Sequence, residues 1–99
     1  MVIQVVNFNL EGITHDQYLE AAKEVAPAFK ELSGLKSKVW LSDEEKNVYG
    51  GVYTWDDHRS MQDYLNGPFY AEVLGDNPSF VNITYKSYEV LDEPTSITT

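Results

Sequence analysis

The stretch Gly34–Trp55, GLKSKVWLSDEEKNVYGGVYTW, decides the fold of this chain. Two runs rich in valine, tyrosine and tryptophan flank the polar turn at residues 42–47, which predicts a β-hairpin. Since side chains alternate along a strand, the first arm sets Lys36, Lys38 and Trp40 against Leu35, Ser37, Val39 and Leu41, and the second sets Tyr49, Tyr53 and Trp55 against Val48 and Val52. Neither side is plainly polar. We therefore expect helices of the same chain to cover one face and a second copy of the sheet to cover the other.

The composition indicates a single globular domain. The chain has 99 residues, 42% of them hydrophobic, and its 13% of aromatic residues suggests a stacked core, an interface or a cavity. Cysteine is absent, which excludes disulfides and thiolate chemistry and suits a reducing compartment, so we expect a cytoplasmic protein. The first residues do not resemble a signal peptide, and no run approaches the ~18 apolar residues of a membrane span.

The charge balance excludes two classes of partner. Sixteen acidic residues against seven lysines and arginines give a net charge of −9. Nucleic-acid binding needs clustered cations that replace phosphate counterions, and anionic membranes need the same. We therefore expect no nucleic-acid or membrane partner, and we interpret the acidity as a contribution to solubility.

The first part of the chain predicts a strand and a helix. Val2–Asn9 is a β-branched run typical of a central strand. Thr14 and Gln17 have the spacing of a capping box, which predicts that a helix starts here. An apolar stripe then continues in phase across Pro27, so we expect one kinked helix that ends at Gly34; the stripe comprises Tyr18, Ala22, Val25, Phe29 and Leu32.

The second half predicts a helix, a short helical piece and a strand. Asp56 or Asp57 caps a helix that carries His58, Met61 and Leu65 on one apolar face. A short helical piece is expected over 69–74 after Pro68, and a long strand over 80–91. Residues 92–99 lack apolar periodicity, so we expect an irregular tail, or one that lies along a partner subunit.

This order of elements predicts an α+β, ferredoxin-like βαββαβ domain over residues 1–91 with a four-stranded antiparallel sheet. Both helices then lie on one face. The other face carries aromatic and β-branched side chains, a larger apolar patch than monomers usually expose. We therefore expect a homodimer in which the two open sheet faces pack together.

Familiar catalytic motifs are absent: no GxGxxG, phosphate loop, HExxH or GxSxG is present. Asp43-Glu44-Glu45 is interpreted as a solvated turn, and the two histidines lack metal-ligand spacing, so no metal site is expected. Gly50-Gly51 has two interpretations. The pair marks a bulge or sharp curvature, or it leaves room for a ligand or an opposing subunit.

A resemblance to a family rests on an ordered set of residues. This set is Ala26-Pro27, Gly34-Leu35, Lys38-Val39-Trp40, an acidic turn, Gly50-Gly51-Val52-Tyr53 and an acidic helix start. It resembles the YdhR-like mono-oxygenases, within the wider group of dimeric α/β-barrel domains of the antibiotic-biosynthesis mono-oxygenase type. The resemblance implies a ferredoxin-like protomer, a dimer and a cavity between sheet and helices. Better-studied members of the wider group oxidise polycyclic phenols with dioxygen and need no cofactor.

Cofactor-free oxygenation requires an apolar cavity, a base that makes a carbanion, and donors for the developing oxyanion. We predict His58 as the base rather than His15, and Tyr53 as a second catalytic residue. The predicted substrate-binding residues are Asn7, Lys38, Trp40, Trp55 and Tyr85, which offer hydrogen-bond donors, a cation and flat apolar surfaces. For Lys38 the alternative is a side chain whose stem covers Trp40.

Two classes of function remain open. The first is a small cofactor-independent mono-oxygenase that acts on a cyclic, enolisable aromatic substrate. The second is a non-catalytic dimeric domain that binds a small ligand or a partner, and a haem-degrading enzyme using Asn7, a tryptophan and His58 is a more distant third. An enclosed apolar pocket of about 300 Å³ or more, lined by His58 and a tyrosine, would favour the enzyme.

Overall fold

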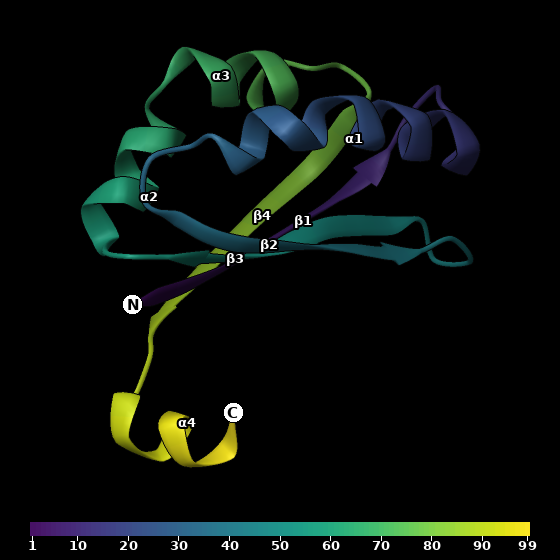
Figure 1. Cartoon of the computed structure of the whole chain (residues 1–99). Coiled ribbons are helices and arrows are strands. Elements are labelled where there is room, and N and C mark those ends of the chain that lie inside the picture. Colours follow the sequence, from purple (N-terminus) through teal and green to yellow (C-terminus); the bar gives the residue numbers. More distant parts are fainter.

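The structure, a computed structural model, describes residues 1–99. It has one four-stranded antiparallel sheet, and the helices α1, α2 and α3 lie on one face of it (Figure 1). In chain order the elements are β1 (Val2–Leu10), α1 (His15–Lys30), β2 (Leu35–Asp43), β3 (Val48–Trp55), α2 (His58–Leu65), α3 (Pro68–Tyr70), the π-helix η1 (Ala71–Gly75), β4 (Phe80–Glu89) and α4 (Asp92–Thr98). The predicted α+β ferredoxin-like fold is confirmed.

The strands are arranged in the order β2-β3-β1-β4, which brings both ends of the chain into the sheet. β1 pairs with β3 and with β4, and the predicted hairpin joins β2 to β3. Trp40 lies opposite Gly51, and Lys38 lies opposite Tyr53. This register puts the two side chains of β2 on the same face as the tyrosines of β3.

Every second residue of β1 is buried beneath the helices, from Val2 to Leu10. On β3 the same face carries Tyr49, Tyr53 and Trp55, all buried. The aromatic arm of the hairpin therefore packs under the helices. The open face carries aliphatic side chains, a single tyrosine, Tyr88, and the polar residues Asn7, Thr54, Thr84 and Lys86, rather than the several aromatics expected there.

Two features of the hairpin differ from simple alternation. A register shift between Leu35 and Ser37 turns Leu35 to the helix side, where it packs against the core, although alternation had placed it with Val39. Gly50 has a φ of 155°, and a Cβ at this position would lie 1.8 Å from the Val6 carbonyl oxygen. The first glycine of the pair is thus required by the close approach of β1.

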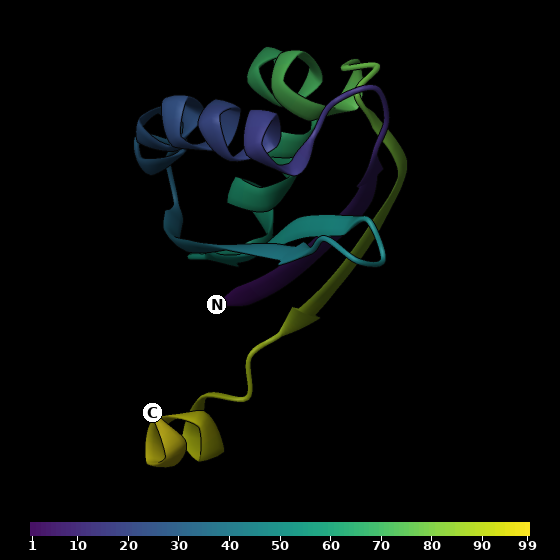
Figure 2. The same cartoon turned by 90° about the vertical axis from the view of Figure 1, so that its right-hand side faces the viewer.

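The capping box at the start of α1 forms as predicted. The Gln17 amide nitrogen donates to the Thr14 hydroxyl at 3.1 Å, and the Gln17 side chain accepts from the Thr14 backbone nitrogen at 2.8 Å. The helix continues across Pro27 to Lys30. It lies alongside α3 and η1 above the sheet, as the turned view shows (Figure 2).

The C-terminal residues form a helix, which corrects the expectation of an irregular tail. α4 has no side-chain cap on its N-cap residue, Leu91, and it lies beyond the end of β4, away from the other helices (Figures 1 and 2). Its apolar side chains find no cover in the chain: Leu91 is 74% exposed and Ile97 is 83% exposed. No helix of the structure combines the length and apolar character that crossing a membrane requires.

Alanine substitutions at two glycines test the close approach of β1 and β3. Gly12→Ala should cost roughly 1 kcal/mol of unfolding free energy, because only its positive φ of 78° opposes a side chain and no atom lies within 4 Å of the added Cβ. Gly50→Ala adds a backbone clash and should cost at least about 2 kcal/mol more. Urea unfolding measures both. Equal losses would contradict the strand packing described here.

Candidate functional site

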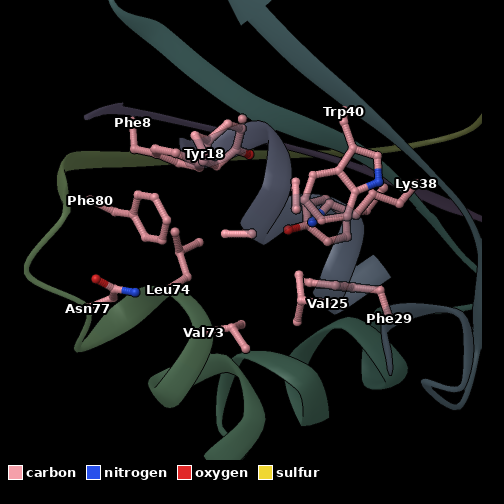
Figure 3. Close-up of a pocket in the computed structure, with 14 residues that line it drawn as sticks. Phe8, Tyr18, Val25, Phe29, Lys38, Trp40, Val73, Leu74, Asn77 and Phe80 are labelled. Atoms are coloured by element: carbon pink, nitrogen blue, oxygen red, sulfur yellow. The ribbon is translucent and has the colours of Figure 1, made fainter. Parts of the chain in front are cut away.

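A cavity of about 200 Å³ lies between the sheet, α1 and η1. Fourteen residues line it, and most of them are apolar (Figure 3). They are Phe8, Tyr18, Ala21, Ala22, Val25, Phe29, Lys38, Trp40, Gly50, Tyr53, Val73, Leu74, Asn77 and Phe80. The apolar stripe predicted on the first helix thus forms one wall of the cavity.

Lys38, on β2, is the one cationic side chain that lines the cavity, and aromatic rings surround its nitrogen. Its Nζ lies 3.4 Å from the ring centroid of Phe29, 3.5 Å from that of Trp40 and 4.7 Å from that of Tyr53. No side chain or backbone group forms a hydrogen bond or ion pair with it. Gly51 leaves room beside this side chain, because a Cβ there would lie 2.9 Å from Lys38 Cε and would displace it.

Burial lowers the pKa of Lys38 from 10.5 to about 7. An apolar site disfavours the charged ammonium, because the rings replace only part of the water that would hydrate it. The amine is therefore present in both protonation states near neutral pH. A group with this property can take a proton from a bound molecule and can return it.

The tyrosines around the cavity stay protonated. Burial raises the pKa of Tyr18 to about 12, and burial and the nearby Tyr64 raise the pKa of Tyr53 further. The hydroxyls of Tyr53 and Tyr64 lie 3.4 Å apart. These groups can donate hydrogen bonds, but they are too weakly acidic to exchange protons near neutral pH.

Asn77 is a polar group at the opposite end of the cavity from Lys38 (Figure 3). Its Oδ1 accepts from the Ser79 amide nitrogen at 3.0 Å, which leaves its Nδ2 without a protein acceptor. Sequence reasoning missed this residue, because Asp76-Asn77-Pro78 was interpreted only as a turn. Nothing in that pattern distinguishes a turn asparagine from one whose amide faces a cavity.

Three of the predicted site residues come together: Lys38, Trp40 and Tyr53 all line the cavity. His58 does not. It is exposed in the first turn of α2, where its Nε2 lies 3.2 Å from the Gln62 side-chain nitrogen. The expectation that it sits on the apolar face is wrong, since Met61 and Tyr64 form that face. At about 200 Å³, the cavity is also smaller than the apolar pocket of about 300 Å³ or more that was expected around His58.

The other predicted site residues also lie away from the cavity. Asn7 is on the open face of the sheet, and its side chain reaches the Tyr49 carbonyl at 3.4 Å. Trp55 is fully buried beneath α2, where its Nε1 donates to Gln4 at 3.0 Å. Tyr85 is 45% exposed on the edge strand β4, near Tyr70.

His15, which was ranked below His58 as a base, lies at the start of α1 beside the hairpin. It is half-buried, and its Nδ1 lies 2.8 Å from the Tyr49 hydroxyl. Both residues line a second hollow of about 370 Å³ between α1 and the hairpin. This hollow shares Tyr18, Ala22 and Trp40 with the cavity, so the side chains of α1 separate the two spaces.

The residues considered for haem do not assemble. Asn7 lies on the open face, His58 lies in the first turn of α2, and Trp55 is sealed in the core. Haem is larger than most drugs, and the cavity of about 200 Å³ is smaller than the sites of roughly 300 Å³ or more that hold drug-sized ligands. Elsewhere, no three histidine, cysteine, aspartate or glutamate side chains come together as a metal site.

The fold and the cavity define a ferredoxin-like α+β protein with an apolar site between its sheet and its helices. The profile of the family described as "Putative mono-oxygenase ydhR" matches residues 3–99. The chain therefore belongs to this family, which confirms the resemblance seen in the sequence. A search of curated proteins found no match.

Solved structures of similar fold include a monooxygenase, an oxygenase and a haem-degrading protein. An antibiotic biosynthesis monooxygenase from Deinococcus radiodurans, named as putative, is 16% identical with a TM-score of 0.74 and covers 91% of this chain and 92% of its own. SnoaB, a cofactor-independent oxygenase from Streptomyces nogalater, is 19% identical (TM-score 0.71; 93% and 97% covered). The haem-degrader MhuD from Mycobacterium tuberculosis is 19% identical (TM-score 0.70; 92% and 96% covered). At these identities the likeness shows the fold alone.

The lowered pKa of Lys38 predicts a pH-dependent stability. The unfolded chain, with a pKa near 10.5, binds more protons than the folded chain between pH 7 and 10, so stability should rise with pH across this window. Lys38→Met should remove the penalty, on the order of 4 kcal/mol below pH 7, and abolish the rise. Denaturant unfolding of both proteins at a series of pH values measures the difference.

A matched control is Lys46→Met, in the exposed turn of the hairpin. This variant should follow the wild type at every pH. If the unfolding free energy of Lys38→Met showed the same pH dependence as the wild type, Lys38 would be hydrated and its pKa would not be lowered.

Proposed function

We propose that this protein is a mono-oxygenase that needs no cofactor and uses Lys38 as the base on a small, enolisable aromatic substrate. One observation carries the proposal: an amine whose pKa burial lowers to about 7 faces an apolar cavity without a carboxylate partner. The cavity of about 200 Å³ suits one or two rings, since about 150 Å³ already holds benzene. Family membership supports the reaction class.

The proposed reaction uses the substrate itself as the reductant. Neutral Lys38 takes a proton from a CH₂ that the substrate carbonyl acidifies, either directly or through a fused aromatic ring, which gives an enolate paired with the Lys38 ammonium. The enolate carbon donates two electrons to dioxygen and forms a C–O bond. The resulting peroxide takes the proton from Lys38, and loss of water leaves a new carbonyl. In sum, CH₂ and O₂ give C=O and H₂O.

Neighbouring groups would hold the charged intermediate. Donors placed where negative charge develops stabilise it most in a site without water. The Tyr53 hydroxyl, which stays protonated, is a donor among the cavity residues beside Lys38, and the Asn77 Nδ2 is available at the far end. Trp40 and Phe29, which pack edge to face with 5.4 Å between centroids, would contact the flat substrate beside Lys38.

Oxygen uptake tests the enzyme hypothesis. With a panel of enolisable ketones from 2-tetralone to anthrone, the wild type should consume oxygen at a rate that rises with pH through about 7, because the base must be neutral. Lys38→Met should lower kcat about 100-fold or more. His58→Ala, outside the cavity, should leave the rate unchanged. No uptake by the wild type would favour the non-catalytic ligand-binding domain, and equal rates in the lysine variant would reject Lys38 as the base.

We further propose that the partner is a second copy of the chain, bound through the open sheet face. This face carries Ile3, Val5, Val39 and Val52, and Val39 is 57% exposed. Val39, Val52 and Val5 form one apolar row across three strands, which ends at Lys86 on β4, and exposed apolar rows of this kind are typical of interaction surfaces. α4 projects on that side of the sheet with apolar side chains uncovered, where a second subunit could cover them (Figure 2).

The mass in solution tests the dimer. The wild type should sediment as a dimer at micromolar concentration. Val39→Lys should shift the equilibrium towards monomer by at least tenfold, because two ammonium groups would be buried in the interface. Gln62→Lys adds the same charge on the exposed surface of α2 and should leave the dimer intact. A monomeric wild type would contradict the proposal.

A further inference from the structure

The Lys38 amine is the strongest nucleophile among the side chains that line the cavity, and no group of the chain binds its nitrogen. Its nitrogen lies over the rings of Phe29, Trp40 and Tyr53 and forms no hydrogen bond or ion pair. We propose that Lys38 captures small aldehydes and ketones covalently, as an imine on its side-chain nitrogen, an activity distinct from oxygenation. The ligands would be compact apolar carbonyl compounds that fit a cavity of about 200 Å³.

The chemical step needs no further reactant. The Nζ lone pair forms a bond to the carbonyl carbon, and the C=O π electrons move to the oxygen. One proton passes from nitrogen to oxygen to give a carbinolamine. The C–O bond then breaks, the oxygen leaves with the second nitrogen proton as water, and a C=N bond forms. The amine and the carbonyl thus give an imine and one water, and nothing is oxidised or reduced.

The surroundings favour the neutral amine that this step requires. Burial lowers the pKa of Lys38 to about 7, whereas exposed lysines stay almost fully protonated at that pH. The titratable groups that line the same cavity are Tyr18 from α1 and Tyr53 from β3, and both stay neutral. Lys30 and Lys36 line a surface hollow on the other side of Lys38, and the carboxylate there, Asp56, pairs with Lys36 at 3.8 Å.

That hollow also offers a path to the amine. It measures about 300 Å³, and it is lined by Lys38, Phe29 and Trp40 together with residues at the edge strand β2. Lys38 therefore separates a surface depression from the cavity. A carbonyl compound can approach the nitrogen without disturbing the sheet, and its apolar part can occupy the cavity beyond.

Reductive trapping tests the proposal in the intact chain. The wild type is incubated at pH 7, without oxygen, with benzaldehyde and sodium cyanoborohydride, which reduces an imine to a stable secondary amine. Peptide mass mapping then compares Lys38 with Lys46. About half of an amine of pKa 7 is neutral at this pH, against roughly one in 2,500 at pKa 10.4. Because a less basic amine is also a weaker nucleophile, we expect labelling of Lys38 to be at least about tenfold faster.

Two comparisons separate the cavity from the surface. Labelling of Lys38 should level off above pH 8, whereas labelling of a solvated lysine with the reference pKa of about 10.4 should keep rising to pH 10. Pyrene-1-carboxaldehyde, too large for the cavity, should label Lys38 no faster than Lys46. Equal benzaldehyde rates at the two lysines, or equal labelling of Lys38 by both aldehydes, would overturn the proposal.

The result stands apart from the oxygenase hypothesis. Trapping without oxygen reports only on the amine, so a chain that consumes no oxygen can still show the imine. The mapping uses the wild type, so the conclusion does not depend on how Lys38→Met folds. Lys46→Met serves as the matched variant and should keep full labelling at Lys38.

Discussion

The burial of Lys38 follows from the alternation of side chains along β2. A strand cannot turn Trp40 under the helices without turning its neighbour at i−2 the same way. The register opposite Gly51 and Tyr53 fixes this orientation, and the irregularity in the pairing of β2 with β3 ends before Lys38. The lysine nitrogen is therefore held among aromatic rings by the same constraint that builds the core. The glycine at position 51 adds space beside its Cε, because a Cβ there would lie 2.9 Å from this atom and the side chain would have to shift.

Much of the fold could be predicted because local and long-range signals agree. The capping box at Thr14, the stripe on the first helix and the polar turn of the hairpin each allow one conformation, and their order allows few topologies. The sidedness of the sheet was harder. Both faces are apolar in the sequence, so alternation gave two sets of side chains without saying which set lies beneath the helices. The C-terminal helix has too few apolar residues to show a period, and it was missed.

The site was less predictable, for reasons that differ between residues. His58 shares a helical period with Met61 and Leu65, but it stands in the first turn, and the buried face of α2 is instead made by Met61 and Tyr64. Asn7 alternates with Val6 and Phe8, so burying those two under the helices necessarily turns Asn7 to the open face. Asn77 reaches the cavity through a turn after a π-helix, and neither strand nor helix periodicity predicts its direction. Lys38, Trp40 and Tyr53 were found because a regular hairpin relates them.

Lys38 also contributes an energetic argument about where function lies. A methionine or leucine would fill the same space and would lose no hydration of a charged group. The lysine ammonium loses its hydration on burial and gains no ion pair in return. Contact with the ring faces offsets part of this desolvation free energy, by about 2 kcal/mol for a desolvated cation. The remaining penalty is the same free energy that lowers the pKa of the amine. The property that would let Lys38 take a proton or attack a carbonyl near neutral pH is thus inseparable from the stability that the fold loses by burying it.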